Sequence, residues 1–233
     1  MPTARAAPSI VFRLRNVASV PRDAAPLIVT AGFMDIAEDK RRLRAAAKAT
    51  RAAAQAADPM APTRLAERFL ASVPVAVHDV VAGYWPIGEE MDVRPLLRAL
   101  DARGVALCLP AVSGAGLPLV FRRWRPGDDL VAGTYGIPAP DASAEQMTPS
   151  ILLVPLLAFD DEGWRLGYGA GYYDRTLAQL RAPATDRAAA DAQPVMAVGV
   201  AYAAQRLAAV PRYATDERLD AVVTEAAVRR FAP

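Results

Sequence analysis

Short apolar runs separated by turn residues dominate the chain from residue 77 onward. Near-continuous apolar runs rich in Val, Ile and Leu are typical of strands that are buried on both faces of a sheet. Gly, Pro, Asp and Ser bound most of these runs, as expected for strands joined by tight turns. We predict strands at 77–86, 104–112, 119–124, 150–159, 195–202 and 220–225.

Helical patterns precede and separate these runs. The segment from Asp35 to Ala57 is rich in Ala, Arg and Lys, and Asp58-Pro59 ends it, so we predict a long helix there. Apolar strands alternating with helices favour a single three-layer α/β/α domain with a mixed, mostly parallel sheet. Ligands bind such sheets at the carboxyl ends of the strands, where we expect a cleft. Further helices are predicted over 62–72, 92–103, 172–182 and 203–208.

The first residues differ from the rest of the chain. Residues 1–33 carry four arginines against one acidic residue and show no sustained period. This composition resembles a transit peptide, but four prolines argue against an amphipathic helix, and a mis-assigned start upstream of Met34 is the alternative. We therefore predict a disordered or untranslated extension over 1–33 and an α/β domain over 34–233. A chain starting at Met34 is expected to stay soluble and active. The segment 181–194 is expected to form a surface loop or a lineage-specific insertion.

Composition excludes several classes of protein. The sequence is 53% hydrophobic and 22% charged, and it contains no apolar run long enough to cross a bilayer. A net charge of +2 gives no support for nucleic-acid binding. The single cysteine, Cys108, excludes an internal disulfide and lies in an apolar run, so we expect a buried, inert thiol in a reducing compartment. The single histidine, His78, excludes a Cys/His zinc site.

The first predicted helix carries a stripe of basic residues. Lys40, Arg44, Lys48 and Arg51 are spaced by four, four and three residues, which places them on one face of a helix. Such a ridge suits the phosphates or the glutamate tail of an anionic ligand. On spacing alone, a solvated helix face is the favoured interpretation.

An acidic turn follows the first predicted strand. The segment 83–93 passes through Pro86 and Gly88, and we predict that Glu89, Glu90 and Asp92 begin a helix. Acidic residues in a first helical turn commonly complement the helix dipole. The functional alternative is a carboxylate at the carboxyl end of a strand, where α/β sheets bind ligands.

A glycine-rich block, "RLGYGAGYYDR", occupies 165–175. Its spacing differs from the dinucleotide-binding fingerprint and from the P-loop. It lies between a predicted strand and a predicted helix, so its backbone N–H groups can bind phosphate at the start of the helix. Asp174 lies within reach of a magnesium ion held by that phosphate, and Arg165 and Arg175 add positive charge. The alternative is a tight glycine turn with aromatic residues packed behind it.

Together these segments resemble the 5-formyltetrahydrofolate cyclo-ligase family, also called 5,10-methenyltetrahydrofolate synthetase. The resemblance spans about residues 35–226, with the matching motifs in the order of the family. The motifs are "KRRLR" (40–44), "YWPIGEEMDV" (84–93), "GTYGIPAP" (133–140), "VPLLAFDDEGWRLGYGAGYYDR" (154–175) and "DERLDAVVTE" (216–225).

The resemblance implies ring closure of 5-formyltetrahydrofolate to 5,10-methenyltetrahydrofolate, with ATP as co-substrate and Mg²⁺ as cofactor. A phosphorylated formyl group is the implied intermediate, and ADP and phosphate are released. The protein then positions groups and neutralises charge, and supplies no nucleophile. A monomeric cytoplasmic protein is implied, which binds these two small molecules but neither nucleic acid nor a membrane.

The resemblance also implies the site residues, by motif. Arg165 and Tyr172 would position the reacting groups, and Asp174 and Asp216 would ligate magnesium. Glu90 would accept hydrogen bonds from the pterin ring. ATP would contact Lys40, Arg41, Arg42, Leu43, Arg44, Arg165, Leu166, Gly167, Tyr168, Gly169, Ala170, Gly171 and Tyr172. The folate substrate would contact Arg44, Trp85, Glu90, Tyr168, Gly169, Ala170, Gly171 and Tyr172.

Some positions depart from the family pattern. Thr215 stands where many members have histidine, and Val93 stands where threonine is common. Tyr168 and Ala170 occupy positions that elsewhere carry a basic residue or glycine. A non-catalytic folate- or nucleotide-binding relative is therefore an alternative, as is a nucleic-acid-binding protein that uses the basic residues.

Overall fold

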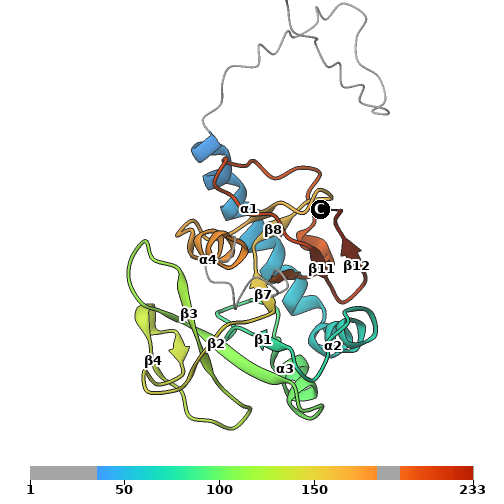
Figure 1. Ribbon diagram of the computed structural model, residues 1–233. Helices are drawn as coiled ribbons and strands as arrows, with labels where there is room; N and C mark the ends of the chain where they lie inside the picture. Colours follow the sequence, from blue (N-terminus) through green and yellow to red (C-terminus); the bar gives the residue numbers. More distant parts are fainter. Residues whose placement is uncertain (1–35, 183–194, 233) are drawn as a thin grey trace, which may run out of the picture. The chain divides into compact units, whose positions relative to one another are not determined.

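The computed structural model describes residues 36–182 and 195–232 (Figure 1). These residues belong to one compact unit, Met34–Pro233. The predicted extension over 1–33 and most of the predicted loop over 181–194 lie outside the described residues, so both stay predictions.

A mixed sheet of eight strands forms the middle layer of the described part of the chain. The strands are β1 (Val80–Ala82), β2 (Ala106–Val112), β3 (Leu119–Arg123), β6 (Gln146–Met147), β7 (Ile151–Pro155), β10 (Met196–Val200), β11 (Ala221–Val223) and β12 (Val228–Arg230). Their order is β12-β11-β10-β7-β1-β2-β3-β6. Neighbours from β11 to β2 are parallel, whereas β12, β3 and β6 pair antiparallel at the two edges. This confirms the predicted mixed, mostly parallel sheet.

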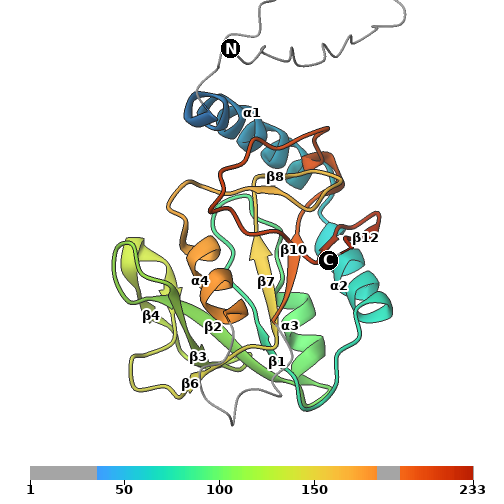
Figure 2. The ribbon, with the colours of Figure 1, turned by 45° about the horizontal axis from the view of Figure 1, so that its top comes forward.

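Helices cover both faces of the sheet. Helices α2 (Ala61–Ser72) and α3 (Arg94–Asp101) lie on one face, and α4 (Tyr172–Arg181) lies on the other (Figure 2). Successive residues of a strand point to opposite faces. Accordingly, Leu153 of β7 packs in the cluster formed with α2 and α3, whereas Leu152 packs in the cluster that contains Leu177 of α4. Burial on both faces explains the continuous apolar runs. None of the described helices is long and apolar enough to cross a bilayer.

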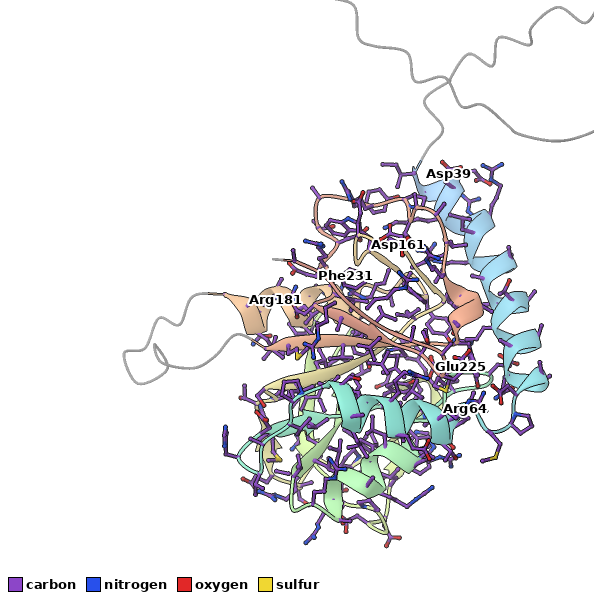
Figure 3. The ribbon with its side chains drawn as sticks, turned by 90° about the vertical axis from the view of Figure 1, so that its right-hand side faces the viewer. Asp39, Arg64, Asp161, Arg181, Glu225 and Phe231 are labelled. Carbon is purple, nitrogen blue, oxygen red and sulfur yellow. The ribbon has the colours of Figure 1, made fainter. Side chains whose placement is uncertain are left out.

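Helix α1 (Ile36–Ala57) lies beyond the carboxyl ends of the parallel strands, next to the hairpin of β8 (Ala158–Phe159) and β9 (Arg165–Leu166). Figure 3 shows α1 extending from Asp39, near its start, toward the end of α2 that carries Arg64. Ala47 on its inner side packs with Leu157, Leu166 and Val210. This packing directs one face of α1 toward the strand ends.

A second small hairpin projects beside β2 and β3 (Figure 1). It pairs β4 (Val131–Ala132) with β5 (Pro138–Ala139), and the short 3-10 turn η1 (Thr134–Gly136) connects the two strands. Tyr135 at its tip has φ 61°, and among the described residues it is the only non-glycine residue with positive φ. Backbone strain of this kind often marks a functional position.

The structure corrects two of the predicted elements. The run predicted as one strand over 150–159 forms β7 and β8, with a break at Leu156 and Leu157. The helix predicted over 203–208 is only a 3-10 turn, η3 (Ala203–Gln205). Both differences involve the buried side chain of Gln205, which donates to the carbonyl oxygens of Leu156 and Leu157 at 2.8 and 3.0 Å and accepts the N–H of Tyr202. A tertiary hydrogen bond thus replaces the continued strand and the continued helix.

The predicted inert cysteine is confirmed as buried. Cys108 lies on β2 with no exposed surface. Burial raises the pKa of its thiol to about 12. A thiol is nucleophilic only as the thiolate, so Cys108 is a packing residue.

Candidate functional site

A cavity of about 770 Å³ opens at the carboxyl ends of β1, β2 and β7. Strand ends contribute Trp85, Val112 and Pro155 to its wall, while α1, the start of α4 and the β4–β5 hairpin complete it. Its size falls within the usual range of small-molecule sites, about 300–1,000 Å³. The predicted cleft at the strand ends is therefore present.

The glycine loop forms one wall of the cavity, and every residue from Arg165 to Arg175 lines it. Gly169 and Gly171 have φ of +108° and +69°, which side-chain-bearing residues rarely adopt. A Cβ at Gly169 would lie 3.2 Å from Cζ of Arg44, and one at Gly171 would lie 2.7 Å from Nη1 of Arg175. The two glycines thus allow both the turn and the close approach of two guanidinium groups.

The basic stripe of α1 faces inward. Lys40 is 5% exposed and forms an ion pair with Asp216, with its Nζ 4.3 Å from the centre of the Tyr213 ring. Arg44 donates from Nε to the carbonyl oxygen of Gly167 at 3.0 Å. Arg51 is also buried, whereas Lys48 is exposed. The interpretation as a solvated helix face is therefore wrong for most of the stripe.

The middle of the "KRRLR" motif does not reach the cavity. Arg41 and Arg42 are exposed and pair with Glu38 and Asp39, at 2.9 and 2.6 Å. Leu43 packs against the small apolar cluster around Ala47. Of the five motif residues predicted to bind ATP, the structure brings only the first and the last, Lys40 and Arg44, to the cavity wall.

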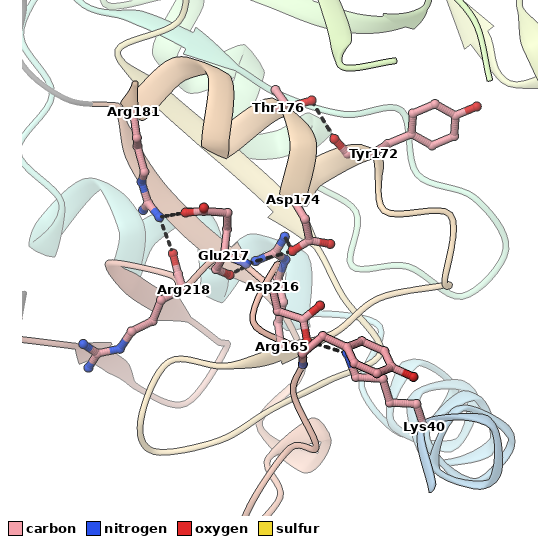
Figure 4. A network of polar contacts seen from close by, with 10 residues as sticks. Lys40, Arg165, Tyr172, Asp174, Thr176, Arg181, Asp216, Glu217 and Arg218 are labelled. Atoms are coloured by element: carbon pink, nitrogen blue, oxygen red, sulfur yellow. Dashed lines mark hydrogen bonds and ion pairs between the residues drawn. The ribbon is translucent and has the colours of Figure 1, made fainter. Parts of the chain in front are cut away.

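Arg165 organises the start of α4. Its Nη2 donates to Oδ1 of Asp174 at 2.7 Å, and its Nη1 donates to the carbonyl oxygen of Glu217 (Figure 4). The same Asp174 oxygen accepts the N–H of Glu217 at 3.1 Å. Burial lowers the pKa of Arg165, and the charges of Asp174 and Asp216 oppose that shift. Arginine remains protonated at neutral pH, so the group stays a cation.

Arg181, at the end of α4, holds the segment that follows Asp216. Its Nη1 donates to Oε2 of Glu217 and to the carbonyl oxygen of Arg218, at 3.0 and 2.8 Å, and its Nη2 donates to Asp220 at 2.8 Å. Figure 4 shows the contacts of Arg181 with Glu217 and Arg218, and those of Glu217 with Asp174 and Arg165. The network ties Asp174 to the segment that begins at Glu217, next to Asp216. Asp216 itself pairs with Lys40.

The residues present fit a magnesium ion that arrives with a phosphate. Among the described residues no group of three or more Asp, Glu, His or Cys side chains could hold a metal alone. Asp174 and Asp216 both line the cavity close to Arg165. Magnesium commonly takes one or two carboxylates, phosphate oxygens and several waters, and this pair provides the carboxylates.

The acidic turn differs from its prediction. Helix α3 begins at Arg94, so Glu89, Glu90 and Asp92 lie in the turn before it and not in its first turn. Asp92 accepts the N–H of Arg94 at 2.9 Å. Glu90 is 4% exposed, lines the cavity and accepts the N–H of Ile87 at 3.0 Å. Burial raises the pKa of Glu90.

Aromatic residues surround Glu90. Trp85 lines the cavity, with Trp124 edge-on at 6.2 Å and Cζ of Arg94 5.4 Å from its ring centre. Its ring is thus both packed and available to a ligand. Tyr168 borders Glu90, and burial together with this carboxylate raises the pKa of the Tyr168 phenol to about 12. Val93, in contrast, is buried in the core, so its departure from the family pattern does not alter the cavity wall.

The cavity has two chemically different ends. The cationic end comprises Lys40, Arg44, Arg165, Asp174 and Asp216. The carboxylate end comprises Trp85, Glu90 and Tyr168, with Arg51 behind them. Lys40 and Arg51 are three helical turns apart on α1, about 16 Å at 1.5 Å per residue.

No role was predicted for Tyr135 from the sequence. It lines the cavity, and its hydroxyl lies 3.2 Å from that of Tyr172. The Gly- and Pro-rich motif at 133–140 marked a turn, but nothing in its composition placed the tip of that turn across the cavity. Thr215, at the position where many family members have histidine, also lines the wall.

These features define an α/β protein with a cavity for an anionic ligand, built from a glycine loop at a helix start, converging cations and two carboxylates. The model of the 5-formyltetrahydrofolate cyclo-ligase family matches residues 36–225. A 5-formyltetrahydrofolate cyclo-ligase of Escherichia coli (strain K12) is 33% identical over 169 residues, which cover 70% of this chain and 87% of that protein. One from Mycolicibacterium smegmatis is 41% identical over 112 residues, 45% of this chain and 57% of that protein.

Solved structures agree with these sequence comparisons. The NMR structure of Aquifex aeolicus 5,10-methenyltetrahydrofolate synthetase has a TM-score of 0.66 and 30% sequence identity, and the match covers 83% of this chain and 93% of that one. The chain belongs to the 5-formyltetrahydrofolate cyclo-ligase family. The predictions of family, fold and enzyme class are confirmed.

Proposed function

We propose that the chain closes the ring of 5-formyltetrahydrofolate to give 5,10-methenyltetrahydrofolate, using ATP and Mg²⁺ and releasing ADP and phosphate. The main support is that one cavity has a cationic end suited to a triphosphate and a carboxylate end suited to a ring rich in N–H donors. The name of the Escherichia coli relative contains this substrate, and the name of the Aquifex aeolicus relative contains this product.

The chemistry requires activation because an amide-like formyl oxygen is a poor leaving group. In the proposed route this oxygen attacks the γ-phosphorus of ATP, the bond to the β-phosphate oxygen breaks, and ADP leaves. N10 of the folate then attacks the formyl carbon, the phosphorylated oxygen leaves as phosphate, and the N10 proton is lost. No protein nucleophile is needed, in agreement with the buried Cys108.

The cationic end would bind the triphosphate. Lys40, Arg44 and Arg165 supply positive charge, and N–H groups of the loop 167–171 lie at the start of α4, where a helix favours anions. Asp174 and Asp216 would hold the magnesium ion, which neutralises charge on the phosphates during transfer. Preorganised positive groups of this kind stabilise the charge that develops in phosphoryl transfer.

The carboxylate end would bind the folate. In its ionised form Glu90 retains lone pairs beyond the one that accepts the Ile87 N–H, and these can accept pterin donors. Trp85 and Tyr168 offer aromatic surface to the flat ring. Glu90 and Trp85 thus set the orientation of the substrate, while the glycine loop places its formyl group near the triphosphate.

A direct assay tests the proposal. The purified protein is mixed with 5-formyltetrahydrofolate, ATP and Mg²⁺, and the near-ultraviolet absorbance of the methenyl product is followed. We expect a band that grows only when all three are present, with ADP formed in equal amount. Binding of both ligands without product would support the non-catalytic relative instead.

We further propose a monomeric protein of the cytoplasm. The support is the single buried thiol, which suits a reducing compartment. Nucleic acid is not an expected partner, since Lys40 and Arg51 of the basic stripe are buried and cannot contribute to an exposed surface that follows a nucleic-acid backbone. Size-exclusion chromatography with light scattering tests the monomer.

A further inference from the structure

Arg51 is a buried cation with unsatisfied hydrogen-bonding groups. It lies on α1, its side chain is 3% exposed, and its Nε and Nη1 have no hydrogen-bond partner among the described residues. A buried unpaired donor costs free energy, and the cost is higher for a charged group. Such an arrangement calls for a functional explanation.

The Arg51 guanidinium faces two other segments of the chain. Its Nη1 lies 3.9 Å from Oε1 of Glu90, its Nη2 lies 3.6 Å from Oε2 of Glu89, and its Cζ lies 5.4 Å from the centre of the Tyr168 ring. Both ion-pair distances exceed hydrogen-bond length. Arg51 therefore links α1 to the acidic turn through charge and not through a fixed hydrogen bond, and it contacts the glycine loop at the Tyr168 side chain.

Arg51 does not line the cavity, whereas Glu90 and Tyr168 do. Any effect of Arg51 on a ligand must pass through these two neighbours. Glu90 has one backbone donor, Ile87 N–H, at hydrogen-bond distance. Burial raises the pKa of Glu90, and the Ile87 N–H, the Tyr168 side chain and the positive charge of Arg51 oppose that shift. Without Arg51, Glu90 would be a buried carboxylate with no counter-ion.

We infer that Arg51 is a positioning residue for the folate substrate, which orients the Glu90 carboxylate and the Tyr168 ring toward the cavity. The inference rests on the proposed function, because Glu90 is the group that would receive the pterin. It predicts selectivity between the two ligands. Lys40, Arg44 and Arg165, which would bind ATP, lie at the other end of the cavity and have no contact with Arg51. ATP affinity should therefore not depend on Arg51.

The alternative role for Arg51 is a brace that only fixes α1 against the rest of the fold. If Arg51 were only a brace, its substitution would lower the stability of the whole protein and weaken the binding of both ligands together. Its effect would also add to that of a change at Glu90, since two independent sites contribute independently. A positioning residue that acts through Glu90 would give non-additive effects.

Titration calorimetry separates the two roles. The dissociation constants of 5-formyltetrahydrofolate and of Mg-ATP are measured for the wild type, Arg51→Met, Glu90→Gln and the double variant. We expect Arg51→Met to weaken folate binding by about tenfold or more and ATP binding by less than about twofold, as for the loss of one partner of a buried charge pair. The double variant should bind folate no more weakly than the worse single variant.

A matched control is Arg64→Met on α2. Arg64 forms an exposed ion pair with Asp58 and does not line the cavity, so both affinities should stay at the wild-type value. Equal weakening of folate and ATP by Arg51→Met, or additive losses in the double variant, would overturn the inference while leaving the proposed function intact. A wild type that binds no 5-formyltetrahydrofolate would overturn both.

Arg51→Lys keeps the test decisive if Arg51→Met does not fold. Lysine retains the charge but lacks the planar fork that can face Glu90 and Glu89 together. We expect a folded variant with a selective loss of folate affinity of about threefold, smaller than that of a neutral residue. Unchanged folate affinity in Arg51→Lys, with Glu90→Gln impaired, would count against orientation by the fork.

Discussion

The two ends of the cavity differ in how completely their charges are satisfied. At the cationic end Arg165 donates to Asp174 at 2.7 Å, Arg44 donates to a loop carbonyl at 3.0 Å, and Lys40 pairs with Asp216. At the carboxylate end Arg51 lies 3.6 and 3.9 Å from its two acidic partners, and two of its nitrogens have no hydrogen-bond partner among the described residues.

This difference shows which interactions must exist before the ligands arrive. A triphosphate has many equivalent oxygens, so a rigid array of cations can bind it without further adjustment, and preorganised charge is what phosphoryl transfer requires. A pterin ring has a fixed pattern of donors, and a carboxylate that is not already saturated can accept them. The protein satisfies one end internally and leaves hydrogen-bonding capacity at the other.

The largest effect is expected from Asp174→Asn at the cationic end. An amide oxygen carries no charge to offset magnesium, so turnover should fall by about two to three orders of magnitude while folate affinity is largely retained. The structure adds a second consequence, because Arg165 loses the anion that neutralises it. Turnover against magnesium concentration and thermal unfolding should be measured together, with a loss of about 1–3 kcal/mol in stability expected.

A matched control for this change is Asp161→Asn. Asp161 pairs with Arg206 and Arg229 on the surface, away from the cavity, so turnover should be unchanged. Near-normal turnover in Asp174→Asn, with the magnesium requirement of the wild type, would show that Asp174 is not a magnesium ligand. Its role would then be limited to its contacts with Arg165 and Glu217.

Glu90→Gln tests the carboxylate end. The amide replaces one acceptor with a donor that meets the pterin N–H groups, so folate affinity should fall by about ten- to a hundredfold and ATP affinity should change little. Calorimetric titration with each ligand measures both. Equal losses of affinity for the two ligands would contradict the assignment of Glu90 to the pterin ring.

The same substitution has a pH signature. Burial raises the pKa of Glu90, and the Ile87 N–H, Tyr168 and the charge of Arg51 oppose that shift. Tyr84 and Tyr173 are its other titratable neighbours. The fold thus favours the protonated carboxyl, a stabilisation fully present below the usual carboxyl pKa and lost as the pH rises through the pKa of Glu90. The melting temperature of Glu90→Gln, relative to that of the wild type, should therefore increase as the pH rises from about 4 to about 8. A constant difference would contradict this.

The sequence predicted the parts of the fold that depend on local patterns. The apolar runs located the long strands, and composition located α1 and α4. It could not locate β4, β5, β6 and β9, which are only two residues long and show no period. The break after β7 depends on the buried Gln205 side chain, 48 and 49 residues away along the chain, which no local pattern reveals.

The candidate site divides in the same way. The family motifs predicted the glycine loop, Glu90, Asp174 and Asp216 as site residues, and all of them line the cavity. Helical spacing grouped Lys40 with Arg51, yet only tertiary packing shows that both are buried. The strained hairpin tip at Tyr135 was not predicted. Its position at the cavity wall depends on how the β4–β5 hairpin packs and not on the composition of the hairpin.

Lys40→Met should have a smaller effect on function than either change above. It removes the cation that pairs with Asp216, whose side chain is 18% exposed. Breaking a largely buried ion pair costs stability, about 3 kcal/mol, and the lost charge should raise the KM for ATP by about tenfold with little change in the KM for folate. Initial rates at varied ATP and varied folate separate the two. A change confined to folate would contradict the assignment of Lys40 to the cationic end.

Tyr135→Phe should have the smallest effect, because it removes a single hydroxyl contact to Tyr172 at a position that is 72% exposed. A neutral hydrogen bond contributes about 0.5–1.5 kcal/mol, and this one is exposed, so the melting temperature should fall by no more than about 3 °C. The KM for folate should rise by about two- to threefold, because the Tyr172 hydroxyl loses the partner that orients it at the cavity wall. Tyr135→Gly separates the hydroxyl from the ring. Glycine relieves the strain of φ 61° and removes the aromatic wall, so it should stabilise the free protein and weaken folate further than Tyr135→Phe does. If Tyr135→Gly bound folate as tightly as the wild type, the hairpin tip would have no role at the cavity.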